Sequence, residues 1–533
     1  MTVTKRRRMV GAVGGLLAAG AGLGLGELAA GLAGGTSPVV GVATHLVDLA
    51  PGPAKDWAVK NLGTADKPIL IGVVLLAVTV FALLAGAIGA SIPRVAVVMT
   101  VFLGLLAILA AATGRTLAAN HFVQVLPGII TLLVATAGIV WVQRSLNLNP
   151  FGGGRRRKTA ATEGSNQLAQ GKLQGDAPAG FDRRGFLVSA LALGAAGVGG
   201  LVGSRLLPDA VSEATRMGIK IPTPASRALG VPAGVSADVA GVSRFMTPNK
   251  QFYRVDTLLT VPKIDPRNWE LRVHGMVDHE LRLNLADLLG RRLIERDITL
   301  TCVSNEVGGP YVGNARWIGV PIADILREAG VQAGADAVRS TSVDGLTIGT
   351  PLQALTDGRD AIFAVAMNGE PLPFEHGFPV RMVVPGLYGY VSATKWVVDV
   401  EVTRFEDFSA YWTDRGWSVE APIKTSSRID VPKGFARIKA GPAVAAGVAW
   451  AQHRGIEKVE VQVDDGPWQP ATLAAEDTID TWRQWTFRWN ATPGNHKLTV
   501  RATDADGYVQ TADRVAPRPN GSSGLHNTVV MVE

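Results

Sequence analysis

The stretch LTCVSNEVGG (residues 300–309) contains Cys302, the single cysteine of a 533-residue chain. It follows the strand-like run DITL (297–300) and passes into a polar turn that ends in two glycines. One cysteine excludes an intrachain disulfide and a paired-cysteine metal site. A lone cysteine is most often a small buried apolar residue. The alternative is a thiolate that binds a soft metal, and the surrounding motifs decide between the two.

The sequence around this stretch predicts a mixed α+β domain over residues 205–423. Helical stretches such as NLADLLGRR (284–292) and PIADILREAG (321–330) alternate with short β-type runs bounded by Gly, Pro and Asp. These runs are WELRVHG, AVRSTSV, AIFAVAMNG, VRMVVPG and KWVVDVEVTRF. From 424 to 533, alternating runs such as VEVQVDDGPW and HKLTVRATDADG predict about seven strands, which indicates an immunoglobulin-like β-sandwich.

Composition and charge indicate a membrane protein rather than a nucleic-acid-binding protein. Hydrophobic residues make up 47% of the chain and charged residues 18%, and the net charge is +7. The clusters Lys5–Arg8 and Arg155–Lys158 each contribute four positive charges, which accounts for the whole excess. Both flank apolar segments, as membrane-topology signals do. We therefore expect membrane lipid, and no nucleic acid, as a partner.

Residues 1–150 predict a membrane domain of about four transmembrane helices. The apolar segments are Met9–Leu32, Pro68–Ala90, Val95–Ala112 and Phe122–Val142. Backbone groups must pair internally in hydrocarbon, so these segments should be helical. The first segment is rich in glycine and holds Glu27. A cleaved secretory signal is the alternative for it.

Residues 151–184 are polar, Gly-rich and basic, and predict a cytoplasmic linker. A fifth apolar segment, 185–204, predicts another transmembrane helix. If Lys5–Arg8 is cytoplasmic, four crossings return the chain to the cytoplasm and the fifth exports the rest. The sequence thus predicts a multi-pass protein of the cell membrane whose large C-terminal part is extracytoplasmic.

Arg183 and Arg184, followed by Gly185, Phe186 and Leu187, resemble a twin-arginine export signal at an internal position. The alternative is an ordinary arginine pair at the border of a membrane helix. The twin-arginine route carries folded proteins, so this signal would predict a cofactor inserted before export.

Motifs from about residue 245 to the end resemble the sulfite oxidase family of molybdenum-cofactor (molybdopterin) oxidoreductases, including its exported bacterial branch. In order they are FYRVDTLLTVP (252–262), WELRVHGMV (269–277), LTCVSNEVGG (300–309), ARWIGVPIADIL (315–326), VRSTSVDG (338–345) and MNGEPLPFEHGFPVRMVVPGLYGYVSATKW (367–396). The C-terminal runs resemble the family's dimerisation domain, which implies a homodimer. The membrane block has no counterpart in the soluble members.

The resemblance implies that the thiolate of Cys302 binds molybdenum beside the two dithiolene sulfurs of a pyranopterin. It implies that Arg254 lies near the metal, where it would hold a polar substrate. The residues that it places in contact with the cofactor are Phe252, Tyr253, Arg254, Asp344, His376, Arg381 and Lys395. Each has a structural alternative, such as a strand-edge ion pair for Arg381 or an ordinary core position for His376.

The resemblance implies oxygen-atom transfer to or from a small-molecule oxo-substrate, but departures leave the substrate open. Glu306 stands where sulfite oxidases carry basic residues, and GLTIGT (345–350) lacks their active-site tyrosine. A negative charge disfavours an anion such as sulfite, so another oxo-acceptor, for example a sulfoxide, remains open. The membrane block suggests a quinone or a membrane cytochrome as electron partner. His45 and His121 are a weak basis for haem, which we do not expect.

A non-enzymatic class stays open beside this hypothesis: a membrane receptor or adhesion protein with an immunoglobulin-like ectodomain. That hypothesis explains the membrane block and the sandwich. It gives no role to Cys302, to the run HGFPVR (376–381) or to the export signal.

Overall fold

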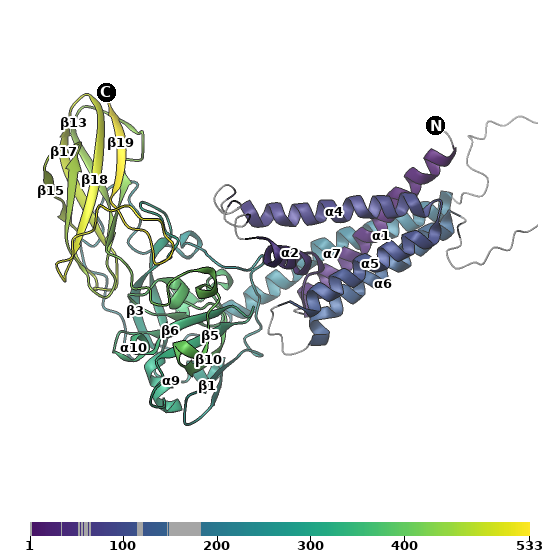
Figure 1. Cartoon of the computed structure of the whole chain (residues 1–533), viewed down its shortest axis with the longest axis horizontal. Coiled ribbons are helices and arrows are strands. Elements are labelled where there is room, and N and C mark those ends of the chain that lie inside the picture. Colours follow the sequence, from purple (N-terminus) through teal and green to yellow (C-terminus); the bar gives the residue numbers. More distant parts are fainter. Residues whose placement is uncertain are drawn as a thin grey trace, which may run out of the picture. The chain divides into compact units, whose positions relative to one another are not determined.

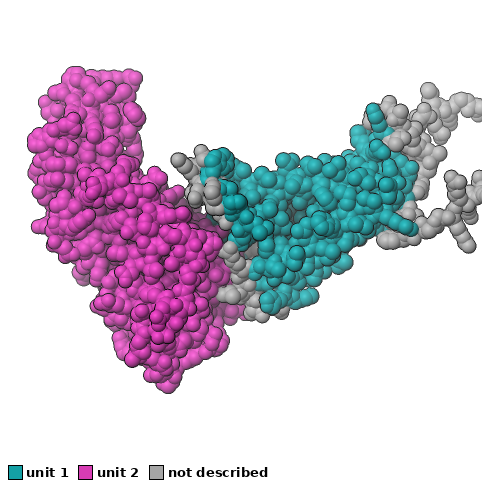
Figure 2. Space-filling model, in the orientation of Figure 1, with its two compact units in different colours: residues 1–213, 258–260 teal, residues 214–257, 261–533 magenta. Residues whose placement is uncertain are grey.

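The computed structural model describes residues 3–33, 35–51, 54, 57, 62, 65–114, 121–146, 148 and 183–533. Its backbone contacts divide the chain into two compact units (Figure 2), residues 1–213 with 258–260, and residues 214–257 with 261–533. The predicted linker, with its basic cluster Arg155–Lys158, lies outside the described residues except for Arg183 and Arg184.

The first unit is helical (Figure 1). Its described helices are α1 (Val3–Ala33), α2 (Pro38–Leu49), α4 (Asp66–Gly89), α5 (Pro93–Ala112), α6 (His121–Ser145) and α7 (Arg183–Met217), whose last residues belong to the second unit. Among the described residues, 5 helices are long and apolar enough to cross a membrane: 5–33, 66–89, 93–112, 121–145 and 184–204. The predicted set of apolar helices is thereby confirmed, whereas their sidedness stays a prediction.

The glycines of α1 permit close packing against neighbouring helices. A Cβ added at Gly15 would lie 2.4 Å from the carbonyl oxygen of Ala82 in α4. One added at Gly86 of α4 would lie 2.1 Å from that of Gly11. Small residues of this kind let helix backbones approach each other where lipid gives no hydrophobic drive. The Gly-rich composition of the first segment therefore has a packing role.

Glu27 has a local role at the start of α2. Its Oε1 accepts a hydrogen bond from the hydroxyl of Ser37 at 2.6 Å. Ser37 is the N-cap of α2, and its Oγ accepts from the backbone N–H of Val40 at 3.2 Å. A carboxylate beside the positive end of a helix is electrostatically favourable, which explains an acidic residue in the apolar segment of α1.

The second unit begins with two five-stranded sheets and three short helices. One sheet has the order β2-β1-β10-β5-β6, and the other β3-β4-β7-β8 with β9 paired to β7. The strands are β1 (Glu270–Gly275), β2 (Leu281–Asn284), β3 (Ile294–Thr301), β4 (Val312–Pro321), β5 (Ala337–Ser342), β6 (Thr347–Pro351), β7 (Ile362–Met367), β8 (Glu370–Pro371), β9 (Arg381–Val383) and β10 (Val397–Thr403). The helices are α8 (Leu285–Leu289), α9 (Ile322–Ala329) and α10 (Leu352–Thr356). The structure thus has the α+β character predicted from the alternating runs.

The helix α9 shows how sequence sets these elements. Ile322, Ile325, Leu326 and Ala329 recur at helical spacing, and all four are buried. Gly330 ends the helix with φ +71, a left-handed conformation that glycine adopts without a Cβ penalty.

The C-terminal residues form two facing sheets, β11-β13-β17-β16 and β12-β19-β18-β14-β15. Their strands are β11 (Ser426–Val431), β12 (Arg437–Ile438), β13 (Gly441–Trp450), β14 (Ile456–Val463), β15 (Trp468–Pro470), β16 (Thr472–Leu473), β17 (Arg483–Ala491), β18 (Gly494–Asp504) and β19 (His526–Val532). Ala445 and Trp485 of the first sheet share one core with Val461 and Val500 of the second. The two-sheet sandwich is therefore present, and its immunoglobulin-like class stays a prediction.

Candidate functional site

Cys302 directly follows β3, in a loop that backbone bonds hold in place. Its N–H donates to the carbonyl of Tyr311 at 3.0 Å, and its carbonyl accepts from the N–H of Asn305 at 3.1 Å. The side-chain Oδ1 of Asn305 closes the loop by accepting from the N–H of Tyr311 at 2.8 Å. The thiol Sγ lies 3.0 Å from the hydroxyl of Ser304. The sulfur is thus fixed at the end of a core strand.

The environment of Cys302 combines partial burial with a nearby cation. Burial raises the pKa of the Cys302 thiol, whereas the Ser304 hydrogen bond and the Lys395 ammonium act in the opposite direction. A thiolate at Cys302 would also affect the pKa values of two nearby tyrosines, Tyr253 and Tyr388. Burial, assisted by Cys302, raises the pKa of Tyr253 well above its usual value and that of Tyr388 to about 12. Both tyrosines are therefore neutral hydroxyl groups beside the sulfur's site.

Arg381 is a buried cation in β9 without a carboxylate partner among the described residues. It is only 5% exposed. Its guanidinium donates to the carbonyls of His376 at 3.2 Å and Met382 at 3.4 Å, and lies 5.1 Å from the ring centre of Trp317. Burial lowers the pKa of Arg381 to about 10. Carbonyl groups do not neutralise its charge, so the field at this position favours an anion.

His376 is held as a neutral ring in the core. Its Nε2 lies 2.8 Å from the carbonyl of Asn249, which requires a proton on that nitrogen. Burial lowers the pKa of His376 to about 4, and the cations Arg381, Lys395 and Arg254 act in the same direction. The ring of Phe252 packs edge-on at 5.6 Å from it. Phe252 itself is buried, so the structure gives it a packing role.

Lys395 and Arg254 share one buried carboxylate. The Nζ of Lys395 lies 3.1 Å, and the Nε of Arg254 2.7 Å, from Oδ2 of Asp256. Burial lowers the pKa of Lys395 to about 8, although Asp256 opposes this shift. The side chain of Arg254 is 39% exposed, whereas that of Asp256 is 3% exposed. One end of this group therefore reaches solvent and the other lies inside.

Asp344 lies in the turn between β5 and β6. Its Oδ2 accepts from the hydroxyl of Thr257 at 3.3 Å. The preceding residue, Val343, donates its N–H to the carbonyl of Trp396 at 3.0 Å. This backbone bond brings the turn that contains Asp344 next to Trp396, the residue after Lys395. Printed contacts thus join Phe252, Tyr253, His376 and Arg381 in one group and Arg254 and Lys395 in another. The roles of the predicted site residues toward a cofactor stay predictions.

Sequence reasoning missed Asp256, Trp317 and Tyr388. Asp256 stands two residues after Arg254 in a quoted motif, and a carboxylate so close to a predicted cationic site residue was an available signal. Tyr388 stands in the run VPGLYGYVSATKW (384–396) and is 4% exposed. Trp317 is fully buried, and sequence gives no sign that its ring faces Arg381.

Glu306 has less influence than its place in the sequence suggests. Glu306 is exposed, and its side chain makes no ion pair or hydrogen bond among the described residues. Water screens an exposed carboxylate strongly. The departure at this position therefore bears less on anion binding than the buried cations do.

A metal site made by protein ligands alone is absent from the described part of the chain, which contains no cluster of three or more His, Cys, Asp and Glu side chains. A site with one protein thiolate needs no such cluster. In the first unit, His45 already bonds through both ring nitrogens, to the carbonyl of Gly41 at 3.1 Å and the hydroxyl of Thr113 at 2.8 Å.

The chain is similar to known oxidoreductases. The model of the "Oxidoreductase molybdopterin binding domain" family matches residues 258–412. The uncharacterized oxidoreductase YuiH of Bacillus subtilis (strain 168) is 35% identical over 153 residues, which cover 29% of this chain and 74% of that protein. Mitochondrial sulfite oxidase of Homo sapiens is 31% identical over 334 residues, which cover 53% of this chain. The chain belongs to the sulfite oxidase family of molybdopterin oxidoreductases.

The matched family region contains Cys302, Asp344, His376, Arg381 and Lys395, whereas residues 252–254 precede it. The chain spans 60% of the length of the human sulfite oxidase. Among solved structures, the sulfane dehydrogenase SoxCD from Paracoccus pantotrophus matches with 22% identity and a TM-score of 0.48, covering 56% of this chain and 85% of that one.

Proposed function

We propose that this protein is a membrane-anchored, extracytoplasmic oxidoreductase that holds a molybdopterin cofactor through Cys302 and carries out oxygen-atom transfer. The observation that carries the proposal is Arg381, a buried guanidinium 5% exposed and without a carboxylate partner among the described residues. A fold seldom buries a charge without pairing it. An anionic cofactor would complete the pairing.

The residues present fit such a cofactor. Cys302 offers one soft sulfur ligand, which suits molybdenum. Arg381 and Lys395 offer charged donors for a phosphate group, and a guanidinium is well shaped for that purpose. His376 adds a neutral ring fixed by Asn249. When bound, the molybdenum cofactor supplies the redox change and the oxo group.

Arg254 is the residue that we assign to substrate. Its side chain is 39% exposed and shares Asp256 with Lys395, so it connects the interior of the network with solvent. Asp256 holds the guanidinium at a fixed place, which favours a polar oxo-substrate over an apolar one. Because Glu306 is exposed, sulfite and other oxo-substrates such as sulfoxides both remain within the proposal.

The remaining assignments rest on sequence and on the apolar helices. Five helices long enough to cross a membrane support anchoring, and a twin-arginine signal at Arg183 and Arg184 would export the folded domain. A quinone or a membrane cytochrome would exchange electrons, and the C-terminal sandwich would form a homodimer. A receptor without a cofactor would leave the charge of Arg381 unexplained.

The test is molybdenum content and oxygen-atom-transfer activity of the purified full chain. We expect wild-type protein to carry molybdenum and Cys302→Ser to lose more than about a hundredfold of its metal retention and activity. Ser304→Ala is the matched control, because it removes the hydroxyl beside Sγ and leaves the sulfur. Equal metal content and activity in wild type and Cys302→Ser would refute the proposal.

A further inference from the structure

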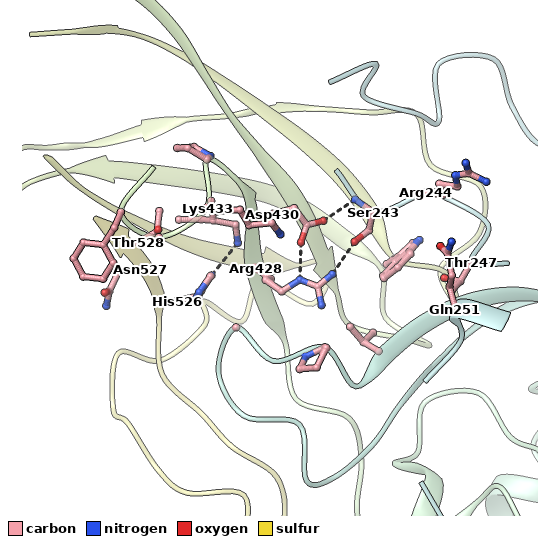
Figure 3. Close-up of a pocket in the computed structure, with 18 of the residues that line it drawn as sticks. Ser243, Arg244, Thr247, Gln251, Arg428, Asp430, Lys433, His526, Asn527 and Thr528 are labelled. Carbon is pink, nitrogen blue, oxygen red and sulfur yellow. Dashed lines mark hydrogen bonds and ion pairs between the residues drawn. The ribbon is translucent and has the colours of Figure 1, made fainter. Parts of the chain in front are cut away.

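A cavity of about 650 Å³ lies within the second unit (Figure 3). Its walls come from residues 243–251, from the end of the Cys302 loop (308–312), and from the C-terminal region at 428–435, Trp482 and 526–529. None of the predicted cofactor or substrate residues, all of which the structure describes, lines it. It is therefore separate from the site described above.

The lining of this cavity carries an excess of positive charge. Arg244, Arg428 and Lys433 line it, against the single carboxylate of Asp430. Asp430 already pairs with the Nε of Arg428 at 2.7 Å. In the part of the chain that the structure describes, no ion pair or side-chain hydrogen bond engages Arg244 or Lys433. Both residues are exposed, so their charges are solvated in the free protein and accessible to an external anion.

A buried hydroxyl in the same lining also lacks a partner. Thr528 of β19 is 7% exposed, and its Oγ1 has no hydrogen-bond partner among the described residues. Buried polar atoms are nearly always bonded. Gln251 and Asn527 place amide groups along the same walls, as Figure 3 shows. The lining thus combines cations with neutral donors, as binding of an oxygen-rich anion requires.

The walls are fixed rather than loose. The NH1 of Arg428 donates to the carbonyl of Gly309 at 2.8 Å, and its NH2 to the hydroxyl of Ser243 at 2.9 Å. The ring of His526 accepts the N–H of Ile429 through Nδ1 at 3.0 Å. Its other edge packs on Gly308, where an added Cβ would lie 2.2 Å from the ring. Fixed walls reduce the ordering cost of binding a ligand.

We propose that this cavity binds a small organic molecule that carries a phosphate or sulfate group. The two unengaged cations bind the anionic group, and the hydroxyl and amides bind its remaining oxygens. A cavity of about 650 Å³ exceeds what one inorganic oxyanion fills and lies in the usual range for organic ligands. The inference goes beyond the proposed enzymatic function and does not depend on it, because binding needs no molybdenum.

The test is isothermal titration calorimetry on the full chain in neutral detergent. The probes are glycerol phosphate, inorganic phosphate, and glycerol as the uncharged match, all at constant ionic strength. We expect saturable binding of glycerol phosphate and none of glycerol. The variant Arg244→Gln/Lys433→Gln should bind about tenfold more weakly for each cation removed. Thr528→Val should weaken binding several-fold while leaving the fold intact.

The matched control is Arg227→Gln/Lys439→Gln, which removes two exposed cations that lie outside the cavity. It should bind glycerol phosphate as wild type does. A parallel titration uses nanodiscs that contain phosphatidylglycerol. Binding there alone, lost in Arg244→Gln/Lys433→Gln, would assign the phosphate to a lipid headgroup. No binding of any phosphate, or equal affinity in the two double variants, would overturn the proposal.

Discussion

The charges of two buried arginines in the second unit are compensated in different ways. Arg428 of β11 is 8% exposed and pairs with the carboxylate of Asp430 at 2.7 Å. Arg381 of β9 is 5% exposed and meets two carbonyls and the ring of Trp317. Burial is alike at the two sites, but only the first charge is neutralised by the protein itself.

We expect this difference to separate a structural charge from one that serves a ligand. The Arg428–Asp430 pair ties the segment at Ser243 and the loop at Gly309 to the sandwich, so its partners are parts of the fold. Around Arg381 lie the cations Lys395 and Arg254 and the neutral phenol of Tyr253, and the carboxylate of Asp256 pairs with those two cations rather than with Arg381. Such an arrangement makes sense when a ligand supplies the negative charge.

The largest effect should follow from breaking the pair that the fold completes. Asp430→Asn leaves Arg428 buried without a counter-charge, which should lower the free energy of unfolding by about 3–5 kcal/mol. Urea unfolding of the full chain in detergent, followed by tryptophan fluorescence, measures this change, since all but two of the 12 tryptophans lie after residue 205.

The control for that measurement is Asp265→Asn, which breaks an exposed pair with Arg267. Exposed pairs contribute little to stability, so this variant should unfold as wild type does. If Asp430→Asn also unfolded as wild type does, the Arg428–Asp430 pair would not stabilise the fold, and the contrast with Arg381 would fail.

A second, smaller effect should appear at Arg381, and in a different quantity. Arg381→Met removes a buried cation without orphaning a carboxylate, so the apoprotein should not lose stability. Cofactor retention should fall about a hundredfold, because a charged donor to an anion is lost. Molybdenum per chain after extensive dialysis measures this retention, with Arg381→Lys as the control that keeps the charge. A loss of stability like that of Asp430→Asn, with full retention, would make Arg381 structural.

The fold was largely readable from the sequence because its signals are local. Apolar length predicted the membrane helices, and alternation bounded by turn residues predicted the strands of both later regions. The start of α1 was ambiguous, since a Gly-rich segment with Glu27 also suits a secretory signal. The packing of α1 against Gly86 and the hydrogen bond from Ser37 to Glu27 both involve residues outside the first segment, so the segment alone could not reveal them.

The site was readable only where motif order carries it. Cys302, His376, Arg381 and Lys395 were predicted from motifs; in the structure Arg381 bonds to His376, and the charge of Lys395 acts on Cys302 and on His376. Asp256 was missed because its importance arises from Lys395, 139 residues later in the chain. The cavity beside Arg244 was also unpredictable, since its walls come from segments that only the fold brings together.

The smallest effect that we predict is a change in the pH dependence of unfolding, and it concerns His526, a neighbour of Arg428. Burial lowers the pKa of His526 to about 4, with Arg428, Arg514 and Lys433 acting in the same direction and Asp430 opposing them. The native state therefore favours the neutral ring more than the unfolded chain does. This contribution is complete above the ordinary histidine pKa of 6.5 and is lost as the pH falls toward 4.

His526→Asn keeps an acceptor for the N–H of Ile429 and cannot titrate, so it should remove on the order of 2 kcal/mol from the pH dependence of unfolding over that interval. Urea unfolding at pH 7 and pH 4.5 measures it, with His279→Asn as an exposed control. An unchanged pH dependence in His526→Asn would mean that burial and the neighbouring cations do not lower the pKa of this ring, which would contradict the prediction.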